Sequence, residues 1–382
     1  MNVLGTETAF EVLAKAKALE AEGRKIIHME IGEPDFDTPD NIKKAGMDAI
    51  RRGYTTYCPS AGLMELRKTV AEQVSESREI SVDPEEVVIT PGAKPIIFFG
   101  ILACINPGDE VIYPNPGYPI YESMINYVGG KAVPLPLDEE KDWRFSIDDL
   151  KARITKKTKM IVLNSPQNPT GGILTEQDLR EIAALAIRHD LWVMSDEAYS
   201  AINYTGKHKS IITEPGMKDR TILLDCHSKT YAMTGWRLGY GVVNKKLAQH
   251  ITRLVTNSVS CTPPFIQCAG IEAINGPQSD TAKMVREFKR RRDIIVKGLN
   301  SIPGFTCTNP SGAFYVFPNV KKVNMNCLQL ADHLLNEAGV ACLSGTCFGE
   351  NGFGYLRFSY ANSVENIRKG LALVKDAVKR IG

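Results

Sequence analysis

The most informative stretch of this sequence is Ser228-Lys229-Thr230-Tyr231-Ala232-Met233-Thr234-Gly235-Trp236-Arg237-Leu238-Gly239-Tyr240. It follows an apolar run, Thr221 to Asp225, which predicts a buried strand. Lys229 therefore stands on a loop just past a strand end, where functional residues of α/β proteins gather. A desolvated lysine beside a second cation, here Arg237, has a pKa lowered from about 10.4 toward about 7 to 8, which suits a nucleophile or a base. Two solvated surface charges are the alternative interpretation of this pair.

This stretch closely resembles the active-site signature of the class I/II aminotransferases, which depend on pyridoxal phosphate (PLP) and share fold type I. In that family the lysine carries the cofactor as a Schiff base, and an arginine eight positions later holds the cofactor phosphate. The resemblance assigns these roles to Lys229 and Arg237, and it places Ser228 among the cofactor-binding residues. It implies an aspartate aminotransferase-like protein.

Composition narrows the class of protein independently of the motif. The 382 residues are nearly neutral, with a net charge of +2, so no global field attracts nucleic acid or an anionic membrane. Nine scattered cysteines without a C-x-x-C pair predict reduced thiols and no metal site. No signal peptide is recognised at the N-terminus, and no apolar run is long enough to span a bilayer. We therefore expect a cytoplasmic protein.

The order of apolar and helical segments predicts an α/β fold. From Val87 onward, short apolar strands alternate with helical stretches, which is typical of a mostly parallel sheet covered by helices on both faces. After about residue 275 the pattern changes to that of a small α+β domain. We expect an N-terminal segment, 1–43, that joins the small domain, a large PLP-binding domain, 44–275, and a small C-terminal domain, 276–382. Thr38 and Pro39 predict the N-cap and first residue of an early helix.

Two strand-end motifs suggest contacts to a cofactor. Thr90-Pro91-Gly92-Ala93-Lys94 joins a strand to a helix, and backbone N–H groups at such a helix start bind phosphate when glycine allows close approach. An ordinary glycine turn is the alternative. The family resemblance assigns phosphate binding to Gly92, Ala93 and Lys94, and stacking on the cofactor ring to Tyr118, for which composition alone favours a core position.

Two further strand ends carry polar residues. Asn168 lies in Asn164-Ser165-Pro166-Gln167-Asn168-Pro169-Thr170-Gly171, which resembles the Asn-Pro-Thr-Gly motif of the family and would otherwise be a turn. The resemblance implies that Asn168 and Tyr199 bind the phenolic oxygen of PLP and that Asn168 also contacts substrate. Asp196 ends a strand and is either a helix cap or, by the resemblance, the carboxylate that keeps the pyridine nitrogen protonated.

The remaining candidate residues concern the substrate and a second subunit. Arg357, in Arg357-Phe358-Ser359, is either half of a surface salt bridge or, by resemblance to the Arg-x-Ser motif, the clamp for the substrate carboxylate. Gly32 lets the backbone approach the same end of the substrate. Tyr57 resembles a family tyrosine that reaches the cofactor phosphate of the neighbouring subunit, which implies a homodimer with shared active sites. Cys226 and His227 depart from the common family pattern, so a phosphate contact at position 226 is not expected.

Together the motifs imply a PLP-dependent aminotransferase. The expected reaction moves the amino group of an L-amino acid to a 2-oxo acid by ping-pong kinetics, with the 2-oxoglutarate/glutamate pair and an aspartate-type donor favoured. Arg357 fixes the substrate carboxylate, and Lys229 acts as general base and then acid. Catalysis is thus expected from Lys229, Asp196 and Tyr199.

Other functions use much of the same machinery. A PLP lyase or synthase of this fold, such as a C–S β-lyase, also needs the three groups at 229, 196 and 357. Aminotransferases for LL-diaminopimelate or aromatic amino acids share the motifs as well. A non-enzymatic effector-binding module is the least favoured alternative, because it would not need a complete catalytic set.

Overall fold

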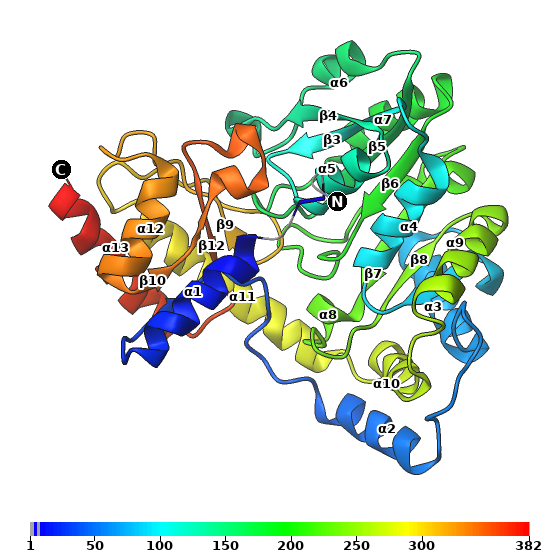
Figure 1. The fold of residues 1–382 in the computed structure, drawn as a ribbon. Coiled ribbons are helices and arrows are strands. Elements are labelled where there is room, and N and C mark those ends of the chain that lie inside the picture. Colours follow the sequence, from blue (N-terminus) through cyan, green and yellow to red (C-terminus); the bar gives the residue numbers. More distant parts are fainter. Residues whose placement is uncertain (1–3, 6–7, 382) are drawn as a thin grey trace.

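The computed structural model describes residues 4–5 and 8–381, and its largest element is a twisted sheet of seven strands (Figure 1). The strand order is β2-β8-β7-β6-β5-β3-β4. Neighbours from β7 to β4 run parallel, whereas β8 is antiparallel to both of its neighbours. The strands are β2 (Val87–Thr90), β3 (Glu110–Asn115), β4 (Lys131–Pro136), β5 (Thr158–Asn164), β6 (Trp192–Asp196), β7 (Thr221–Cys226) and β8 (Gly239–Val242). The predicted mostly parallel α/β sheet is confirmed.

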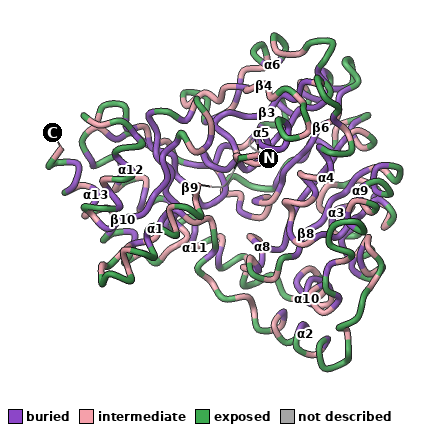
Figure 2. The backbone as a smooth tube through the Cα atoms, viewed as in Figure 1, coloured by how far each residue is buried: buried purple, intermediate pink, exposed green. Residues whose placement is uncertain are grey.

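Helices cover both faces of this sheet because successive strand side chains alternate between the faces. Val111 and Val162 pack with α4 (Lys94–Cys104), α5 (Ile120–Tyr127) and α9 (Lys245–Ser258). Ile112 and Ile161 point the other way, toward α6 (Ile147–Arg153) and α7 (Glu176–Arg188). Helix α3 (Met64–Arg78) covers the β2–β8 end of that second face. Both faces are therefore buried, as the central strands show in Figure 2.

Three further helices belong to the part of the chain that forms the sheet. They are α2 (Asp40–Arg51), the short α8 (His227–Thr230) and α10 (Pro264–Asn275). Helix α2 packs on α10 at one end of the molecule (Figure 1). The predicted N-cap of α2 is wrong. Pro39 is the N-cap residue, and the Thr38 hydroxyl instead donates a hydrogen bond of 2.6 Å to the carbonyl oxygen of Ala232. Thr38 thus fastens the N-terminal segment to the loop that follows Lys229.

The C-terminal part of the chain forms a second core together with N-terminal residues. Its strands are β1 (Ile27–His28), β9 (Tyr315–Val316), β10 (Val340–Ala341), β11 (Leu343–Ser344) and β12 (Leu356–Ser359), and its helices are α1 (Thr8–Ala21), α11 (Ser279–Leu299), α12 (Cys327–Ala338) and α13 (Val364–Ile381). Strand β1 pairs in parallel with β10, and β12 lies between β11 and β9. The N-terminal segment is therefore hydrogen-bonded to the C-terminal part of the chain, and the two share one core.

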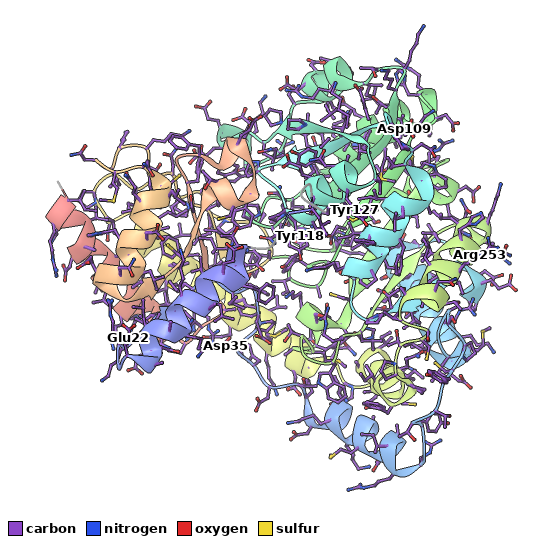
Figure 3. The ribbon with its side chains drawn as sticks, viewed as in Figure 1. Glu22, Asp35, Asp109, Tyr118, Tyr127 and Arg253 are labelled. Atoms are coloured by element: carbon purple, nitrogen blue, oxygen red, sulfur yellow. The ribbon has the colours of Figure 1, made fainter. Side chains whose placement is uncertain are left out.

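The two cores meet along the ends of the parallel strands. In Figure 3, Tyr118 lies in the central region where these parts approach each other, whereas Asp109 and Arg253 lie at the periphery. Residues at or just beyond the carboxyl ends of β2, β5, β6 and β7 therefore face Arg357 of β12 and the segment 31–33 that follows β1. Ligands of open α/β sheets bind at such strand ends, so a functional site is expected at this junction.

Candidate active site

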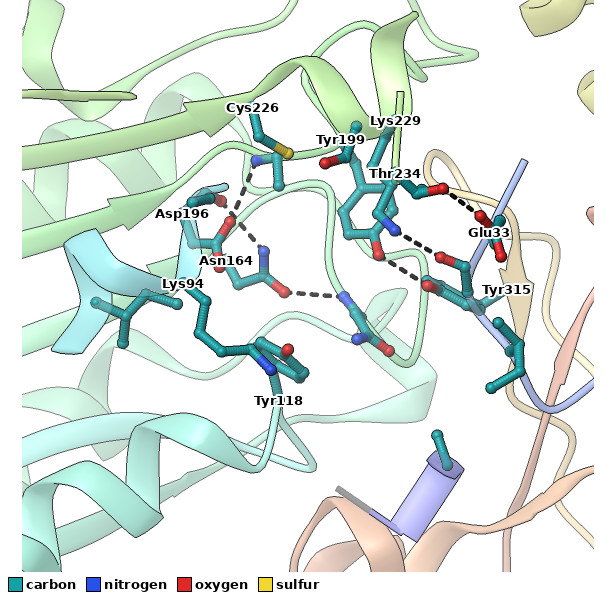
Figure 4. Close-up of a pocket in the computed structure, with 18 of the residues that line it drawn as sticks. Glu33, Lys94, Tyr118, Asn164, Asp196, Tyr199, Cys226, Lys229, Thr234 and Tyr315 are labelled. Atoms are coloured by element: carbon teal, nitrogen blue, oxygen red, sulfur yellow. Dashed lines mark hydrogen bonds between the residues drawn. The ribbon is translucent and has the colours of Figure 1, made fainter. Parts of the chain in front are cut away.

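A cavity of about 470 Å³ lies at this junction and collects nearly all of the residues singled out from the sequence (Figure 4). Those that line it are Gly32, Ala93, Lys94, Tyr118, Asn168, Asp196, Tyr199, Ser228, Lys229, Arg237 and Arg357. They come from both cores and from positions scattered over more than three hundred residues. Such convergence of polar side chains in one cavity is the usual mark of an active site.

Two candidate residues do not line the cavity. Gly92 lies directly behind its wall, where a Cβ atom would stand only 2.4 Å from Nη2 of Arg237. The Tyr57 side chain is 88 % exposed on the loop that follows α2, away from the cavity of its own chain. Its predicted contact with a neighbouring subunit stays a prediction.

One end of the cavity is built to receive an anion. Gly92 adopts a φ of 87°, which turns the chain sharply between β2 and α4. The N-terminus of α4 opens on the cavity at Ala93 and Lys94, and no side chain caps it. Arg237 lies opposite, held by a 2.8 Å hydrogen bond from Nη1 to the carbonyl oxygen of Thr234. Helix N–H groups and two cations together favour a phosphate here.

Asp196 lies at the buried end of the cavity, at the last position of β6. The Tyr121 hydroxyl donates a hydrogen bond of 2.6 Å to Oδ2, and the backbone N–H of Ala198 donates to Oδ1 at 3.2 Å. Burial nevertheless raises the pKa of Asp196 to about 6. A carboxylate that costs this much to ionise is stabilised by a cation placed beside it, and a protonated ring nitrogen is such a cation.

Lys229 faces the cavity from α8, directly after β7. Its Nζ donates a 2.5 Å hydrogen bond to the carbonyl oxygen of Gly32. Burial lowers the pKa of Lys229; the cations Arg237 and Arg357 act in the same direction, and Glu33 opposes them. A larger fraction of Lys229 is consequently in the neutral amine form than for a surface lysine. The neutral amine suits both covalent chemistry and proton transfer.

Arg357 projects from β12 and is buried. Nη1 donates a hydrogen bond of 3.1 Å to Oδ1 of Asn168, and Nη2 donates to the carbonyl oxygen of Glu30. The guanidinium lies over the rings of Tyr315 and Phe348, at 4.5 and 5.0 Å from their centroids. Nε has no hydrogen-bond partner among the residues that the structure describes. A buried cation with spare donor capacity can bind a carboxylate.

A pair of tyrosines closes the side of the cavity near Gly32. The hydroxyls of Tyr199 and Tyr315 are 2.7 Å apart. A Cβ atom at position 32 would overlap the Tyr315 hydroxyl, so only glycine fits there. Burial raises the pKa of Tyr199 well above its ordinary value, so this hydroxyl stays protonated and available as a donor.

Several cavity residues were missed by sequence reasoning. Tyr315 and Asn164 line the cavity, Glu33 accepts a hydrogen bond from the Thr234 hydroxyl at its mouth, and Tyr121 supports Asp196 from outside. Tyr121 follows Tyr118 by one helical turn, and Glu33 is adjacent to Gly32, so spacing gave a signal for both. Tyr315 comes from the second core, and no local pattern connects it to the cavity.

The chemistry of these residues fits PLP. The uncapped helix terminus beside Gly92 matches a phosphate, the buried acid at 196 matches an aromatic nitrogen base, and the amine at 229 matches an aldehyde. Within residues 4–5 and 8–381, no group of His, Cys, Asp or Glu is arranged to hold a metal ion. Over the same residues, no helix has both the length and the apolar character to cross a membrane.

Comparison with known proteins agrees with this geometry. The family model "Aminotransferase class I and II" matches residues 24–373. This chain belongs to the class I and II aminotransferase family. The chain is therefore an aminotransferase. Members of this family depend on PLP. The family assignment predicted from the 228–240 stretch is confirmed.

Individual relatives extend over nearly the whole chain. A probable aspartate/prephenate aminotransferase of Aquifex aeolicus is 39 % identical, covering 97 % of this chain and 95 % of the relative. Aromatic-amino-acid aminotransferase 2 of Thermococcus litoralis is 38 % identical, covering 93 % and 92 %. The solved aspartate aminotransferase of Thermus thermophilus with maleate superposes with a TM-score of 0.94 at 35 % identity, covering 98 % of each chain. Enzymes named for acidic substrates and enzymes named for aromatic substrates are thus about equally similar to this chain.

Proposed function

We propose that this aminotransferase binds PLP in the cavity around Lys229 and transfers the amino group of L-aspartate, or a similar acidic amino acid, to 2-oxoglutarate. The observation that carries the proposal is that Lys229, Asp196 and Arg357 line one cavity. A lysine of lowered pKa, a buried acid and a guanidinium that share one cavity are typical of an active site.

Each residue has a distinct task. When bound, PLP supplies an aldehyde and a ring that withdraws the electron pair released at the substrate Cα. Arg357 binds the α-carboxylate of the amino acid in two-point geometry and so orients the Cα–H bond toward Lys229. The Lys229 amine removes the Cα proton as a general base and, once protonated, returns a proton as a general acid.

The surroundings keep these groups in position. Asp196 holds a proton at the pyridine nitrogen, and the hydrogen bonds from Tyr121 and Ala198 fix the direction of its carboxylate. Gly92, Ala93, Lys94, Ser228 and Arg237 hold the phosphate end. Tyr118 stacks on the ring, while Asn168 and the Tyr199 hydroxyl bind the phenolic oxygen. Gly32 leaves room for the substrate beside Tyr315.

Four cations in the cavity attract anionic ligands, and the names of relatives favour an acidic amino acid among these. Lys94, Lys229, Arg237 and Arg357 line it, against the carboxylates of Glu33 and Asp196. The aspartate names of several relatives support the same choice.

A second candidate is transfer from an aromatic amino acid. Phe10, Ile31 and Ile97 give the cavity an apolar wall, and Phe10 is 60 % exposed on α1 at its edge. The relative named for aromatic amino acids supports this alternative. Burial of an aromatic ring against this wall would compensate for the missing second carboxylate.

The assembly and the domains belong to the same proposal. We propose a homodimer in which Tyr57 of one subunit reaches the phosphate site of its partner, in a cytoplasmic protein. The division into 1–43, 44–275 and 276–382 is supported by the pairing of β1 with β10, and residues 1–3, 6–7 and 382 lie outside the described part. It assigns the cavity to the border between the domains.

An amino-donor panel tests the function. Purified PLP-loaded protein is incubated with 2-oxoglutarate and each L-amino acid, and glutamate formation is measured. We expect the largest kcat/KM with L-aspartate. Preference for phenylalanine or tyrosine supports the second candidate, whereas pyruvate and ammonia from a single amino acid, without glutamate, would show a lyase and contradict the proposal.

A further inference from the structure

A second cavity, of about 310 Å³, lies on the other side of the strand end that precedes Lys229. Its walls come from α3, from residues 200–208 after β6, from the end of β7 with α8, and from β8 and α10. Cys226 lines both cavities, so the end of β7 is a wall that they share. The volume is within the range of pockets that hold small molecules.

The second cavity contains Asp225, a buried acid without a cationic partner. Its carboxylate accepts hydrogen bonds from the Ser200 hydroxyl at 2.8 Å and from the Cys226 backbone N–H at 2.6 Å. None of the ion pairs among the described residues includes Asp225. Burial raises its pKa to about 7, and the more distant charge of Arg78 offsets this only in part. A cation that entered the cavity would therefore stabilise the ionised side chain.

The basic side chains of this cavity already have other acidic partners. Nη2 of Arg78 and Nε2 of His208 donate to the Glu197 carboxylate at 2.8 and 2.9 Å. Nζ of Lys207, which is exposed, donates to Glu79 at 2.6 Å. Arg78 and Lys207 are thus each matched by one carboxylate. With His208 neutral, the carboxylate of Asp225 is the uncompensated charge of the cavity.

Two buried imidazoles of the same cavity have unused nitrogen atoms. Nδ1 of His208 has no hydrogen-bond partner among the described residues, and in the neutral ring it is an acceptor because Nε2 donates to Glu197. His227 is 1 % exposed, and neither of its ring nitrogens has a hydrogen bond of ordinary geometry within the described chain. Burial lowers the pKa of His227 to about 4, against a contact with the Gly270 backbone, so this ring is neutral at pH 8 and keeps one lone pair.

We propose that the second cavity binds a small primary ammonium compound, with its charged group at Asp225. A primary ammonium carries one positive charge and three N–H donors, which match a carboxylate and two imidazole acceptors. An ammonium fits better than a metal ion, because no group of His, Cys, Asp or Glu within residues 4–5 and 8–381 is arranged to hold a metal. Asp225 does not line the active-site cavity, so this site is separate from the catalytic residues.

Calorimetric titration with butylammonium chloride tests this site. The full-length protein is first treated with borohydride, so that no aldehyde of bound PLP can condense with the amine, and is titrated at pH 8, where Asp225 is ionised. We expect saturable binding of one butylammonium per chain. The uncharged 1-butanol and the anion butyrate should bind at least about tenfold more weakly, because they lack the charge-assisted hydrogen bond to the carboxylate. Asp225→Asn should weaken butylammonium binding by about the same factor, whereas the control Asp196→Asn, which changes the buried acid of the other cavity, should bind like the wild type.

Three results would overturn the proposal. The first is that butylammonium shows no saturable binding, which would mean that water alone fills the cavity. The second is that 1-butanol binds as tightly as butylammonium, a comparison that uses only the wild type and so does not depend on how the variants fold. The third is that binding is lost in Asp196→Asn and kept in Asp225→Asn, which would place the amine in the active-site cavity. None of these readouts requires PLP or amino transfer, so they are separate from a failure of the proposed function.

Discussion

Replacing Asp196 with Asn should stabilise the cofactor-free protein while removing most of the activity of the PLP-loaded enzyme. The side chain is buried, and its carboxylate accepts hydrogen bonds from the Tyr121 hydroxyl and the Ala198 N–H. Asn keeps nearly the same shape without the charge. The change therefore separates the cost of a buried anion from its catalytic use.

The magnitude follows from the pKa. Burial raises the pKa of Asp196 from 3.8 to about 6. Because the folded state retains the proton to higher pH than the unfolded chain, the free energy of unfolding falls as pH rises through this interval. At about 1.4 kcal/mol per pH unit, the ionised side chain costs the folded protein about 3 kcal/mol above pH 6. At pH 5 the cost is about half as large.

Urea unfolding of the cofactor-free protein measures this difference. Asp196→Asn should raise the free energy of unfolding by about 3 kcal/mol at pH 7.5 and by about 1.5 kcal/mol at pH 5. Asp225→Asn is the matched control, because Asp225 is also a buried strand residue and burial raises its pKa to about 7, yet it lines a different cavity. It should stabilise the protein and leave amino transfer within a few-fold of wild type.

The catalytic half of the prediction has the opposite sign. Leaving the ring nitrogen without its buried partner should cost about 3 to 5 kcal/mol, or a loss of about 10² to 10³-fold or more in kcat. Two results would refute the reasoning. One is an Asp196→Asn variant that transfers amino groups at the wild-type rate. The other is a stability gain that is the same at pH 5 and pH 7.5.

The other residues of the site give three further predictions. Arg357→Lys should lower kcat/KM for the amino acid by about 30-fold, because one point charge replaces a two-point contact worth about 2 kcal/mol; steady-state kinetics that show no change in KM would contradict this role. Glu33→Gln should lower the pKa of Lys229 further, since Glu33 raises it. Acylation of Lys229 in the cofactor-free protein, followed by peptide mapping, should then be faster at pH 7.5, and an unchanged rate would exclude the effect. Tyr57→Phe should weaken PLP binding about fivefold by removing one hydrogen bond of about 1 kcal/mol; equal affinity in a cofactor titration would remove Tyr57 from the phosphate site.

Much of the sheet was predictable because its strands carry strong local signals. Apolar runs such as Val87–Thr90 and Thr221 to Asp225 are short, β-branched and bounded by turns, and both became buried strands. The antiparallel strand β8 was not predicted, because Gly239 and Gly241 weaken its β propensity. Glycine is needed at 239, where a Cβ atom would lie 2.5 Å from the backbone of Ala93.

The residues of the site likewise fall into two groups, those that the local sequence predicts and those that tertiary packing brings to the cavity. Asp196 ends a strand, and Lys229 and Asn168 lie a few residues beyond strand ends, so a sequence motif fixes both their identity and their place in the fold. Tyr315 reaches the cavity only because the second core packs against the strand ends, and Thr38 bonds across to Ala232 instead of capping its own helix. Contacts of this kind depend on tertiary packing, which local patterns do not encode.

Reductive fixation of PLP is the most direct measurement of the central claim, that one buried amine holds the cofactor. The PLP-loaded protein is treated with borohydride, digested and mapped by mass spectrometry. We predict a single modified peptide with the phosphopyridoxyl group on Lys229, and none in Lys229→Ala. A label on Lys94 or another lysine, or no covalent label at all, would contradict the account.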